Sequence, residues 1–165
     1  MFTLARHAEA GEKRSWLRAD QERPLTAMGQ RQAAGLAQSL AILKGPRLVS
    51  SPYLRCVQTL DPLAARLGTG VATDVRMIPH ADTRGLTPQD DLFHDTVICT
   101  HGEVIAALLR RWSLEGVVTM PIPHSTIRKN STAKGAAWMF VDDGDRVAGH
   151  YIRPLIVGAI ADADT

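Results

Sequence analysis

Hydrophobic residues in this chain form two kinds of pattern. Short continuous apolar runs have the length of buried strands, at residues 2–5, 47–50, 71–77 and 95–100. Between them, apolar residues recur at helical spacing over residues 26–43, 51–67 and 102–112. Thr26 is expected to cap the first of these helices. Strands that alternate with helices predict a mainly parallel sheet that is covered by helices on both faces.

Prolines indicate where two of the helices begin and whether the helix over residues 51–67 is continuous. Ser51 followed by Pro52 is a typical helix start, with the serine as cap and the proline in the first turn. Pro62 lies inside the same helical pattern, so we expect a kink there or a restart capped by Asp61. Thr87–Pro88 indicates one more short helix.

The end of the chain has a different pattern. It indicates a hairpin, with strands at 135–141 and 146–152 and a turn at 142–145. The predicted fold class is therefore α/β: a three-layer αβα sandwich with a mainly parallel central sheet and a C-terminal hairpin. We expect a single domain over residues 1–155 and a loosely held tail over residues 156–165.

Composition narrows the class of protein only moderately. The chain has 165 residues, 45% hydrophobic and 22% charged, which is ordinary for a soluble globular protein. The formal net charge of +2 gives no argument for a nucleic-acid partner. No apolar run reaches membrane-spanning length, and Arg6 and His7 interrupt the first run too early for a signal peptide. We expect a cytoplasmic protein whose two cysteines, Cys56 and Cys99, are small buried residues.

Ionisable side chains follow three of the predicted strands. Arg6 and His7 follow the first strand, Arg55 lies just after the second, and His101 follows the fourth. Because ligands bind at the carboxyl edge of an open α/β sheet, we expect these four side chains to meet there. Guanidinium groups match phosphate oxygens, and a neutral imidazole can attack phosphorus. The pattern predicts a site for a phosphoryl group.

The same side chains lie in motifs that resemble the histidine phosphatase superfamily, which includes the cofactor-dependent phosphoglycerate mutases. The matching segments are Leu4–Ala10, Pro24–Thr26 with Gly29 and Gln32–Ala33, Ser50–Pro52 with Arg55, Gln58–Thr59, and Thr100–Glu103. The chain is similar to the small bacterial phosphohistidine phosphatases. In Arg55–Ala65, and in Lys134–Gly135 with Trp138 and Tyr151, it is also similar to the phosphatase-like C-terminal domain of some actinobacterial Nudix hydrolases.

The resemblance implies a phosphatase with His7 as the residue that accepts the phosphoryl group. Arg6, Arg55 and His101 complete the phosphate pocket, and Gly102 contributes to substrate binding. It implies no cofactor and no metal ion. The expected partner is a phosphorylated protein or a small phosphorylated molecule.

Two departures from the family pattern affect the predicted chemistry. Ala8 stands where the family often has glycine, which is a mild change. Many members place a general-acid glutamate shortly after the third strand, whereas residues 74–82 contain none, so that Asp82 or His80 would have to replace it. A phosphohistidine nitrogen or a phosphoanhydride oxygen leaves more easily without an acid than a sugar alkoxide does. The sequence thus favours protein phosphohistidine or a nucleotide-type phosphate and argues against mutase activity.

Two other classes stay open. His7-Ala8-Glu9 and His101-Gly102-Glu103 both have the spacing His-x-Glu, which a metal-dependent hydrolase could use, although the chain has no His-Glu-x-x-His pattern. The missing glutamate would also suit a non-catalytic or regulatory module that only binds phosphate.

Overall fold

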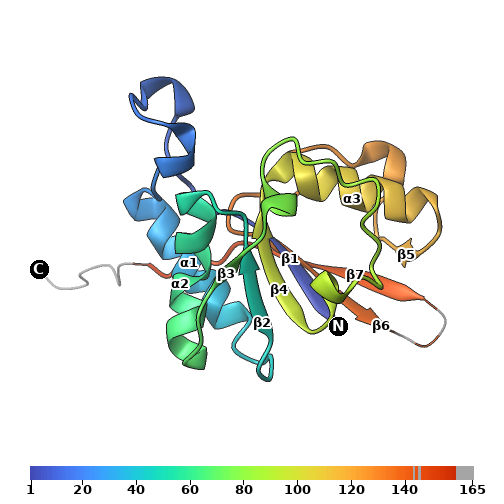
Figure 1. Cartoon of the computed structure of the whole chain (residues 1–165). Helices are drawn as coiled ribbons and strands as arrows, with labels where there is room; N and C mark the ends of the chain where they lie inside the picture. The colour runs from blue at the N-terminus through green and yellow to red at the C-terminus, as the bar shows by residue number, and fades with distance from the viewer. Residues whose placement is uncertain (143, 145, 159–165) are drawn as a thin grey trace, which may run out of the picture.

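The computed structural model describes residues 1–142, 144 and 146–158. In this part of the chain the strands form one seven-stranded sheet with the order β3-β2-β4-β1-β6-β7-β5 (Figure 1). The strands are β1 Phe2–Arg6, β2 Arg47–Ser50, β3 Ala72–Thr73, β4 Thr96–Thr100, β5 Val118–Thr119, β6 Ala137–Asp142 and β7 Val147–Ile152. The helices are α1 Ala27–Ser39, α2 Leu54–Leu67 and α3 Gly102–Leu114. Short 3-10 turns are η1 Lys13–Ser15, η2 Asp20–Glu22, η3 Val75–Met77, η4 Asp91–Phe93 and η5 His124–Thr126.

The sheet has a parallel half and an antiparallel half. Strands β3, β2, β4 and β1 pair in parallel, whereas β6 pairs antiparallel with both β1 and β7. β5 extends the far edge in parallel with β7. The mainly parallel sheet with a C-terminal hairpin is therefore confirmed.

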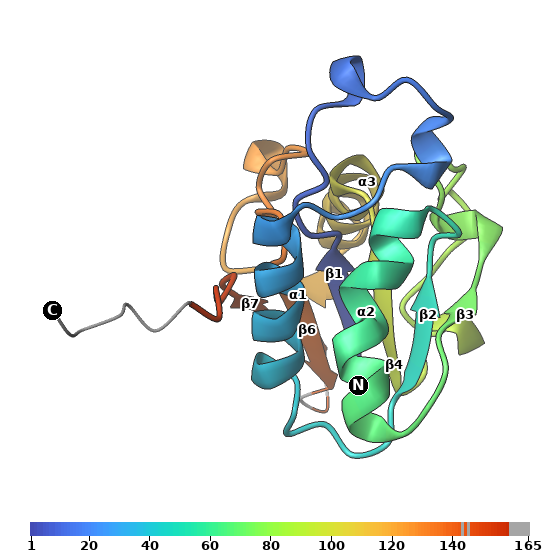
Figure 2. The ribbon, with the colours of Figure 1, turned by 90° about the vertical axis from the view of Figure 1, so that its left-hand side faces the viewer.

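The helices lie on both faces of the sheet. Helices α1 and α2 cover one face and α3 covers the other, as the two views show (Figures 1 and 2). Successive residues of β4 point to opposite faces of the sheet. Ile98 packs in the core under α3, while Val97 and Cys99 pack in the core under α1 and α2. This alternation makes the expected αβα sandwich, because each face of a buried strand needs its own apolar cover.

The first helix begins as predicted, and the second does not. Thr26 caps α1, with its Oγ1 accepting a hydrogen bond from the backbone N–H of Gly29 at 3.1 Å. Helix α2 begins at Leu54 with Tyr53 as its N-cap residue, so the start expected at Ser51 and Pro52 was wrong. The Ser51 hydroxyl instead lies 3.0 Å from a ring nitrogen of His101, in the site described below.

Helix α2 also runs through its proline. Pro62 lies inside a helix assigned without interruption, so the restart expected at Asp61 was wrong. A proline removes one backbone donor from the helix. The buried stripe that contains Leu60, Leu63 and Ala64 continues on both sides of it and holds the helix to the sheet.

Three further differences lie between the main elements. The strand predicted over 71–77 is only the short β3, because the Asp74 carboxylate accepts from the backbone N–H of Arg76 at 2.8 Å and turns the chain into η3. The short helix expected at Thr87–Pro88 is absent from the described residues there, and a 3-10 turn follows at η4. Strand β5 was not predicted, since two residues show no periodicity.

The ends of the described segments bear on two other expectations. Residues 143 and 145 of the predicted turn, and residues 159–165 of the predicted tail, lie outside the described residues. The start of that tail contacts α1, where the backbone N–H of Val157 donates to the carbonyl of Arg31 at 3.4 Å.

Two compositional expectations can be compared with the structure. Cys56 and Cys99 are both buried and free, as predicted. Among the helices of the described residues, none is long and apolar enough to cross a membrane.

Candidate active site

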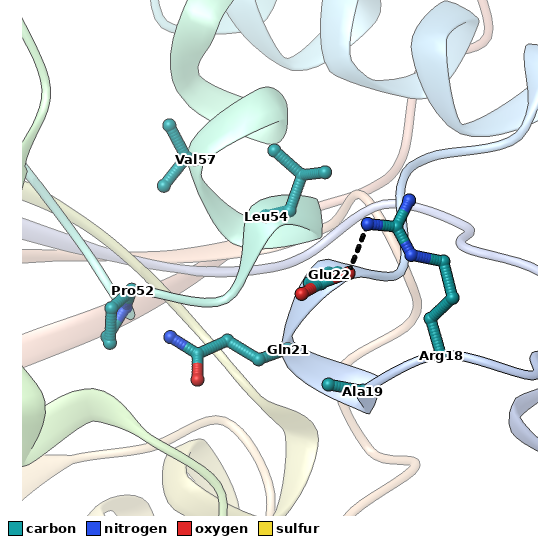
Figure 3. A pocket seen from close by; sticks show the side chains of 7 residues that line it. All are labelled: Arg18, Ala19, Gln21, Glu22, Pro52, Leu54 and Val57. Atoms are coloured by element: carbon teal, nitrogen blue, oxygen red, sulfur yellow. Dashed lines mark ion pairs between the residues drawn. The ribbon is translucent and has the colours of Figure 1, made fainter.

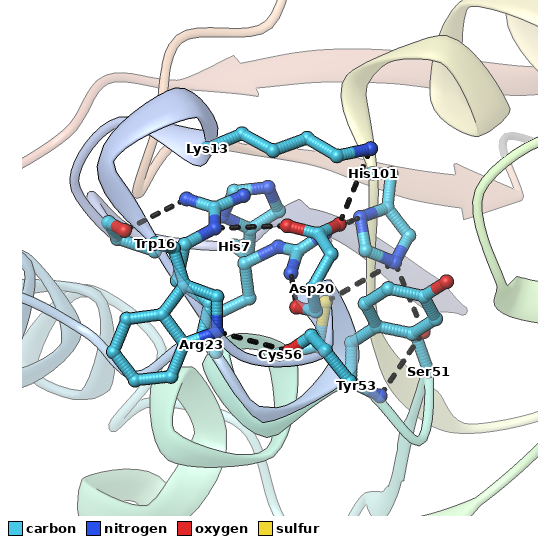
Figure 4. Close-up of polar contacts among 12 residues, drawn as sticks. His7, Lys13, Trp16, Asp20, Arg23, Ser51, Tyr53, Cys56 and His101 are labelled. Atoms are coloured by element: carbon cyan, nitrogen blue, oxygen red, sulfur yellow. Dashed lines mark hydrogen bonds and ion pairs between the residues drawn. The ribbon is translucent and has the colours of Figure 1, made fainter.

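The site lies where three neighbouring parallel strands end. β4 pairs with β1 on one side and with β2 on the other, so His7, Ser51 and His101 follow adjacent strands at one edge. The imidazole rings of His7 and His101 approach edge to face, with centroids 5.3 Å apart (Figure 4). Arg55 lies in the first turn of α2, and its Nη2 is 3.5 Å from Nδ1 of His101. The structure thus brings together the four residues singled out in the sequence.

The tautomer of His7 is determined by its neighbour. Its Nδ1 lies 2.8 Å from the carbonyl oxygen of Ala8. A carbonyl only accepts, so Nδ1 carries the proton and Nε2 keeps a free electron pair. Burial lowers the pKa of His7 to about 3, and the positive charges of Arg55 and Arg6 act in the same direction. At neutral pH the ring is an uncharged base with Nε2 available for attack on phosphorus.

Side chains from α1 and α2 hold the loop after β1 in place. Thr59 accepts from the backbone N–H of Ala8 at 3.0 Å and donates to the carbonyl of Arg55 at 2.6 Å. The Gln32 amide oxygen accepts from the backbone N–H of Glu9 at 2.8 Å. Thr59 and Gln32, which belong to the family motifs, therefore hold the loop that follows His7.

Each of the two arginines has a buried Nε donor without a partner among the described residues. Arg6 donates through Nη1 to the carbonyl of Thr132 at 2.7 Å, and Arg55 donates through Nη1 to the carbonyl of Asp20 at 2.7 Å. The Nε atoms of Arg6 and Arg55 are buried and have no hydrogen-bond partner in the described part of the chain. Buried donors are almost always paired in folded proteins. Two unpaired guanidinium donors at the end of one sheet are suited to the oxygens of an oxyanion.

His101 presents one ring nitrogen to the pocket. Its Nε2 lies 3.0 Å from the Ser51 hydroxyl, and its Nδ1 lies 3.5 Å from Nη2 of Arg55. A guanidinium only donates, so Nδ1 is the acceptor and Nε2 carries the proton. Burial lowers the pKa of His101 to about 2, with His7 and Arg55 adding to the effect. An anion bound beside Nδ1 would favour its protonation and a hydrogen bond to the bound oxygen.

Gly102 allows α3 to begin close to Arg6. A Cβ at this position would lie 2.3 Å from the Lys129 carbonyl oxygen and 2.9 Å from Nε of Arg6. Any larger residue would therefore displace the Arg6 guanidinium. The free N–H groups and the positive end of the α3 dipole add to the preference of this edge for anions.

Asp20 is a pocket residue that the sequence analysis treated as part of a loop. Its Oδ1 accepts from Nε of Arg23 at 2.9 Å, and its Oδ2 accepts from Nη2 of Arg55 at 3.2 Å. Burial alone would raise the pKa of Asp20, but the hydrogen bond from Arg23 and the charges of Arg55 and Arg23 outweigh it and lower the pKa. The Asp-x-x-Arg spacing is visible in the sequence, but only the tertiary structure shows that it reaches Arg55.

The structure places Asp82 elsewhere. Its carboxylate is 62% exposed and accepts from Nε and Nη2 of Arg84 at 2.9 and 2.7 Å. The hydrogen bonds from Arg84 lower the pKa of Asp82 to about 2. Asp82 is thus an ionised surface group in an ion pair with Arg84, and its hydrogen bonds within the described part of the chain include none to the four pocket residues. His80 is also exposed and turns the chain with a positive φ of 61°.

An open hollow adjoins this site. It has a volume of about 590 Å³ and lies between the start of α2 and η2 (Figure 3). Pro52, Leu54 and Val57 give it an apolar side. The polar side consists of Gln21 with the ion pair between Arg18 and Glu22, whose N–O distance is 2.8 Å. None of the four pocket residues lines the hollow, but its lining includes the sequence neighbours of Asp20 and Arg55, which are hydrogen-bonded to each other.

The His-x-Glu pairs do not form a metal centre within the described residues. No group of three or more His, Cys, Asp or Glu side chains is arranged there to hold an ion. The Glu9 carboxylate accepts from the Thr26 hydroxyl at 3.0 Å, at the N-terminus of α1.

Comparison with known proteins identifies the class. The profile of the histidine phosphatase superfamily (branch 1) matches residues 2–90, more than half of the chain, and the chain belongs to this family. The resemblance stated from the motifs is confirmed. The expected enzyme class, a phosphatase, is the class of this family.

One curated relative is an 8-oxo-(d)GTP phosphatase from Mycolicibacterium smegmatis. It is 28% identical over 159 residues, which are 92% of this chain and 47% of that protein. The chain therefore spans about half the length of this curated relative.

Solved structures share the fold. A protein from Agrobacterium tumefaciens named as phosphohistidine phosphatase SixA has a TM-score of 0.69 at 18% identity, with 92% of this chain and 96% of that chain covered. Bacillus stearothermophilus YhfR has a TM-score of 0.64 at 17% identity, with 90% and 94% covered. Identities this low show the fold alone.

The pKa of His7 gives a testable pH dependence. The folded state keeps the ring neutral down to about pH 3, whereas the unfolded state takes up a proton near pH 6.5. Between these values the unfolded chain binds more protons, so acidification destabilises the fold. From pH 7 to pH 5, wild type should lose about 2 kcal/mol more unfolding free energy than His7→Asn does. Urea unfolding at both pH values measures this difference, and equal losses would contradict it.

Proposed function

We propose that this protein is a metal-independent phosphatase that works through a phosphohistidine intermediate on His7. One observation carries the proposal: a neutral His7 with a free Nε2 lies beside two arginines that each keep a buried donor unpaired. Membership of the histidine phosphatase superfamily supports it. Arg6, Arg55, His101 and Gly102 are the proposed substrate-binding residues.

The reaction has two steps. In the first, the Nε2 electron pair of His7 attacks phosphorus, the bond from phosphorus to the leaving group breaks, and the leaving group departs with that electron pair. In the second, water attacks the phosphorus, the bond to Nε2 breaks, and inorganic phosphate leaves as the dihydrogen ion. Arg6, Arg55 and protonated Nδ1 of His101 stabilise the charge that develops on the phosphoryl oxygens in both steps.

The proposed substrates carry phosphate on a good leaving group, either phosphohistidine in a protein or a nucleotide-type anhydride. Asp82 is a surface ion pair, and Asp20 is held ionised by Arg23 and Arg55, so neither carboxyl is a proton donor in the resting site. A substrate that leaves without a proton suits such a site. The names of the relatives, which include phosphohistidine and 8-oxo-(d)GTP phosphatases, agree with these two classes.

The hollow beside the pocket is the proposed place for the leaving group. Its apolar side at Pro52, Leu54 and Val57 and its volume of about 590 Å³ leave room for a base or for a side chain and its flanking residues. Its wide opening toward solvent also suits a phosphate carried by a protein. The cytoplasmic setting and the domain limits expected from the sequence remain predictions.

The phosphoenzyme is the direct test of the proposal. Turnover of a phosphohistidine protein in excess chelator, quenched in alkali, should leave an acid-labile phosphate on Nε2 of His7, detectable by mass spectrometry. His7→Ala should carry no phosphate and should show no turnover. If His7→Ala keeps near wild-type activity, or if chelator abolishes turnover and one metal restores it, the proposed mechanism is wrong.

Arg55 should matter more for catalysis than for folding. Its guanidinium faces the phosphoryl oxygens, so Arg55→Ala should lower kcat/KM about a hundredfold or more. Arg66→Ala is a matched control, because Arg66 is exposed in the last turn of the same helix. Steady-state kinetics and thermal melts measure both variants. A large drop in melting temperature with full activity in the folded fraction would assign Arg55 a structural role.

The leaving group should determine which substrates are used. We expect kcat/KM to be high for a phosphohistidine protein or a nucleoside diphosphate, and at least about tenfold lower for an alkyl phosphate, which needs a proton donor. Parallel assays of the three compounds give this comparison. A preference for the alkyl phosphate would show that the site contains a general acid.

A further inference from the structure

The Asp20 side chain occupies the phosphate pocket as an anion. Arg55, whose side chain is only 4% exposed, directs both terminal nitrogens at Asp20: Nη1 to the backbone carbonyl at 2.7 Å and Nη2 to Oδ2 at 3.2 Å. Arg23 binds the other carboxylate oxygen at 2.9 Å, and Nζ of Lys13 lies 3.9 Å from Oδ2. One carboxylate thus contacts three cations and offsets one of their three positive charges.

The same guanidinium atom is needed by the phosphoryl group. Nη2 of Arg55 lies 3.2 Å from the Asp20 carboxylate and 3.5 Å from Nδ1 of His101. A phosphoryl oxygen that contacts both Arg55 and His101 therefore meets the Asp20 carboxylate at that point. Two carboxylate oxygens resemble two phosphoryl oxygens in charge and spacing, and arginine binds both in the same way.

We propose that Asp20 is an internal anion that competes with the substrate phosphoryl group for Arg55 and so determines how tightly the site binds phosphate. This inference rests on the proposed function, because it needs the pocket to bind a phosphoryl group. With the site empty, Asp20 balances the buried charge of Arg55. When a phosphoryl group enters, the carboxylate leaves Nη2 or remains close to the bound anion, and either event weakens binding.

The position of Asp20 in the fold suits a movable competitor. It lies in η2, within the segment 11–23 that stands out beyond the sheet edge in both ribbon views (Figures 1 and 2). The turns η1 and η2 contain no buried residue, and Leu17 between them is 97% exposed. A segment with so few buried contacts moves at low cost. Arg23 anchors its end, since Nη1 donates to the carbonyls of Ala10 and Gly11.

The test compares Asp20→Asn with Glu12→Gln. Glu12 is the matched control because it lies in the same segment and carries the same charge, but it is exposed and is not among the residues that line the hollow. Binding of inorganic phosphate and of tungstate is measured by calorimetry at neutral pH. Asp20→Asn should bind both anions about tenfold more tightly than wild type, because it removes a like charge from the pocket. Glu12→Gln should bind them as wild type does.

Kinetics on a phosphohistidine protein gives a second readout. Asp20→Asn should lower KM by a similar factor and leave kcat within about twofold, since a competitor for binding is absent from the transition state. Phosphate should also raise the melting temperature of Asp20→Asn more than that of wild type. If Asp20→Asn does not fold, Asp20→Ser replaces it in every measurement.

Each other outcome decides against the inference. Unchanged or weaker anion binding in Asp20→Asn would show that Asp20 only orients Arg55. Tighter binding with a large fall in kcat that grows with the basicity of the leaving group would make Asp20 a proton donor instead. If neither wild type nor variant binds an oxyanion, the proposed function itself fails, whereas wild-type binding without an effect of Asp20→Asn overturns this inference alone.

Discussion

The parallel pairing of β4 with β1 and β2 is the constraint on which the site depends. It places the residues that follow three strands next to one another, although they are far apart in the sequence. His7 and His101 leave the sheet from neighbouring strands and approach edge to face. The hydroxyl of Ser51, from the third strand, fixes the ring of His101. A shift of one residue in this register would turn these side chains to the other face of the sheet.

The second constraint is electrostatic. Arg55 is almost fully buried and Arg6 is half-buried beside two histidines, and unpaired buried charges are costly. The protein meets this cost in two ways. Backbone carbonyls and the Asp20 carboxylate accept from the terminal guanidinium nitrogens, while burial keeps both imidazoles neutral. The buried Nε donors of both arginines remain without a partner in the described part of the chain, which suits the oxyanion of the proposed function.

These constraints agree with the proposed chemistry. A nucleophile that is neutral far below physiological pH needs no separate base, and a positive pocket needs no metal ion to bind phosphate. The carboxylate nearest to the pocket is ionised, so the site favours leaving groups that depart without a proton. The hollow between α2 and η2 is the proposed place for such groups.

Much of this protein follows from local sequence pattern. The short continuous apolar runs of the strands, the helical stripes and the cap at Thr26 are local properties, and they predicted the layered fold. Arg6, His7, Arg55 and His101 could be found because a parallel sheet brings the ends of its strands to one edge. Local pattern was less reliable where tertiary contacts compete with it. Ser51 binds His101 instead of capping α2, and helix α2 continues past Pro62 because its buried side chains pack on the sheet.

Only the tertiary structure shows which carboxylate binds Arg55 in the pocket. The sequence offered Asp82 by its place after the third strand, and in the structure Arg84, two residues further on, holds it in an exposed ion pair. Asp20 lies in a polar loop without periodicity, and its contact with Arg55 joins residues that are 35 positions apart. Secondary structure and motif order depend on near neighbours, so the sequence determined them. The charge balance of a buried site depends on which distant groups meet, and only the folded chain decides that.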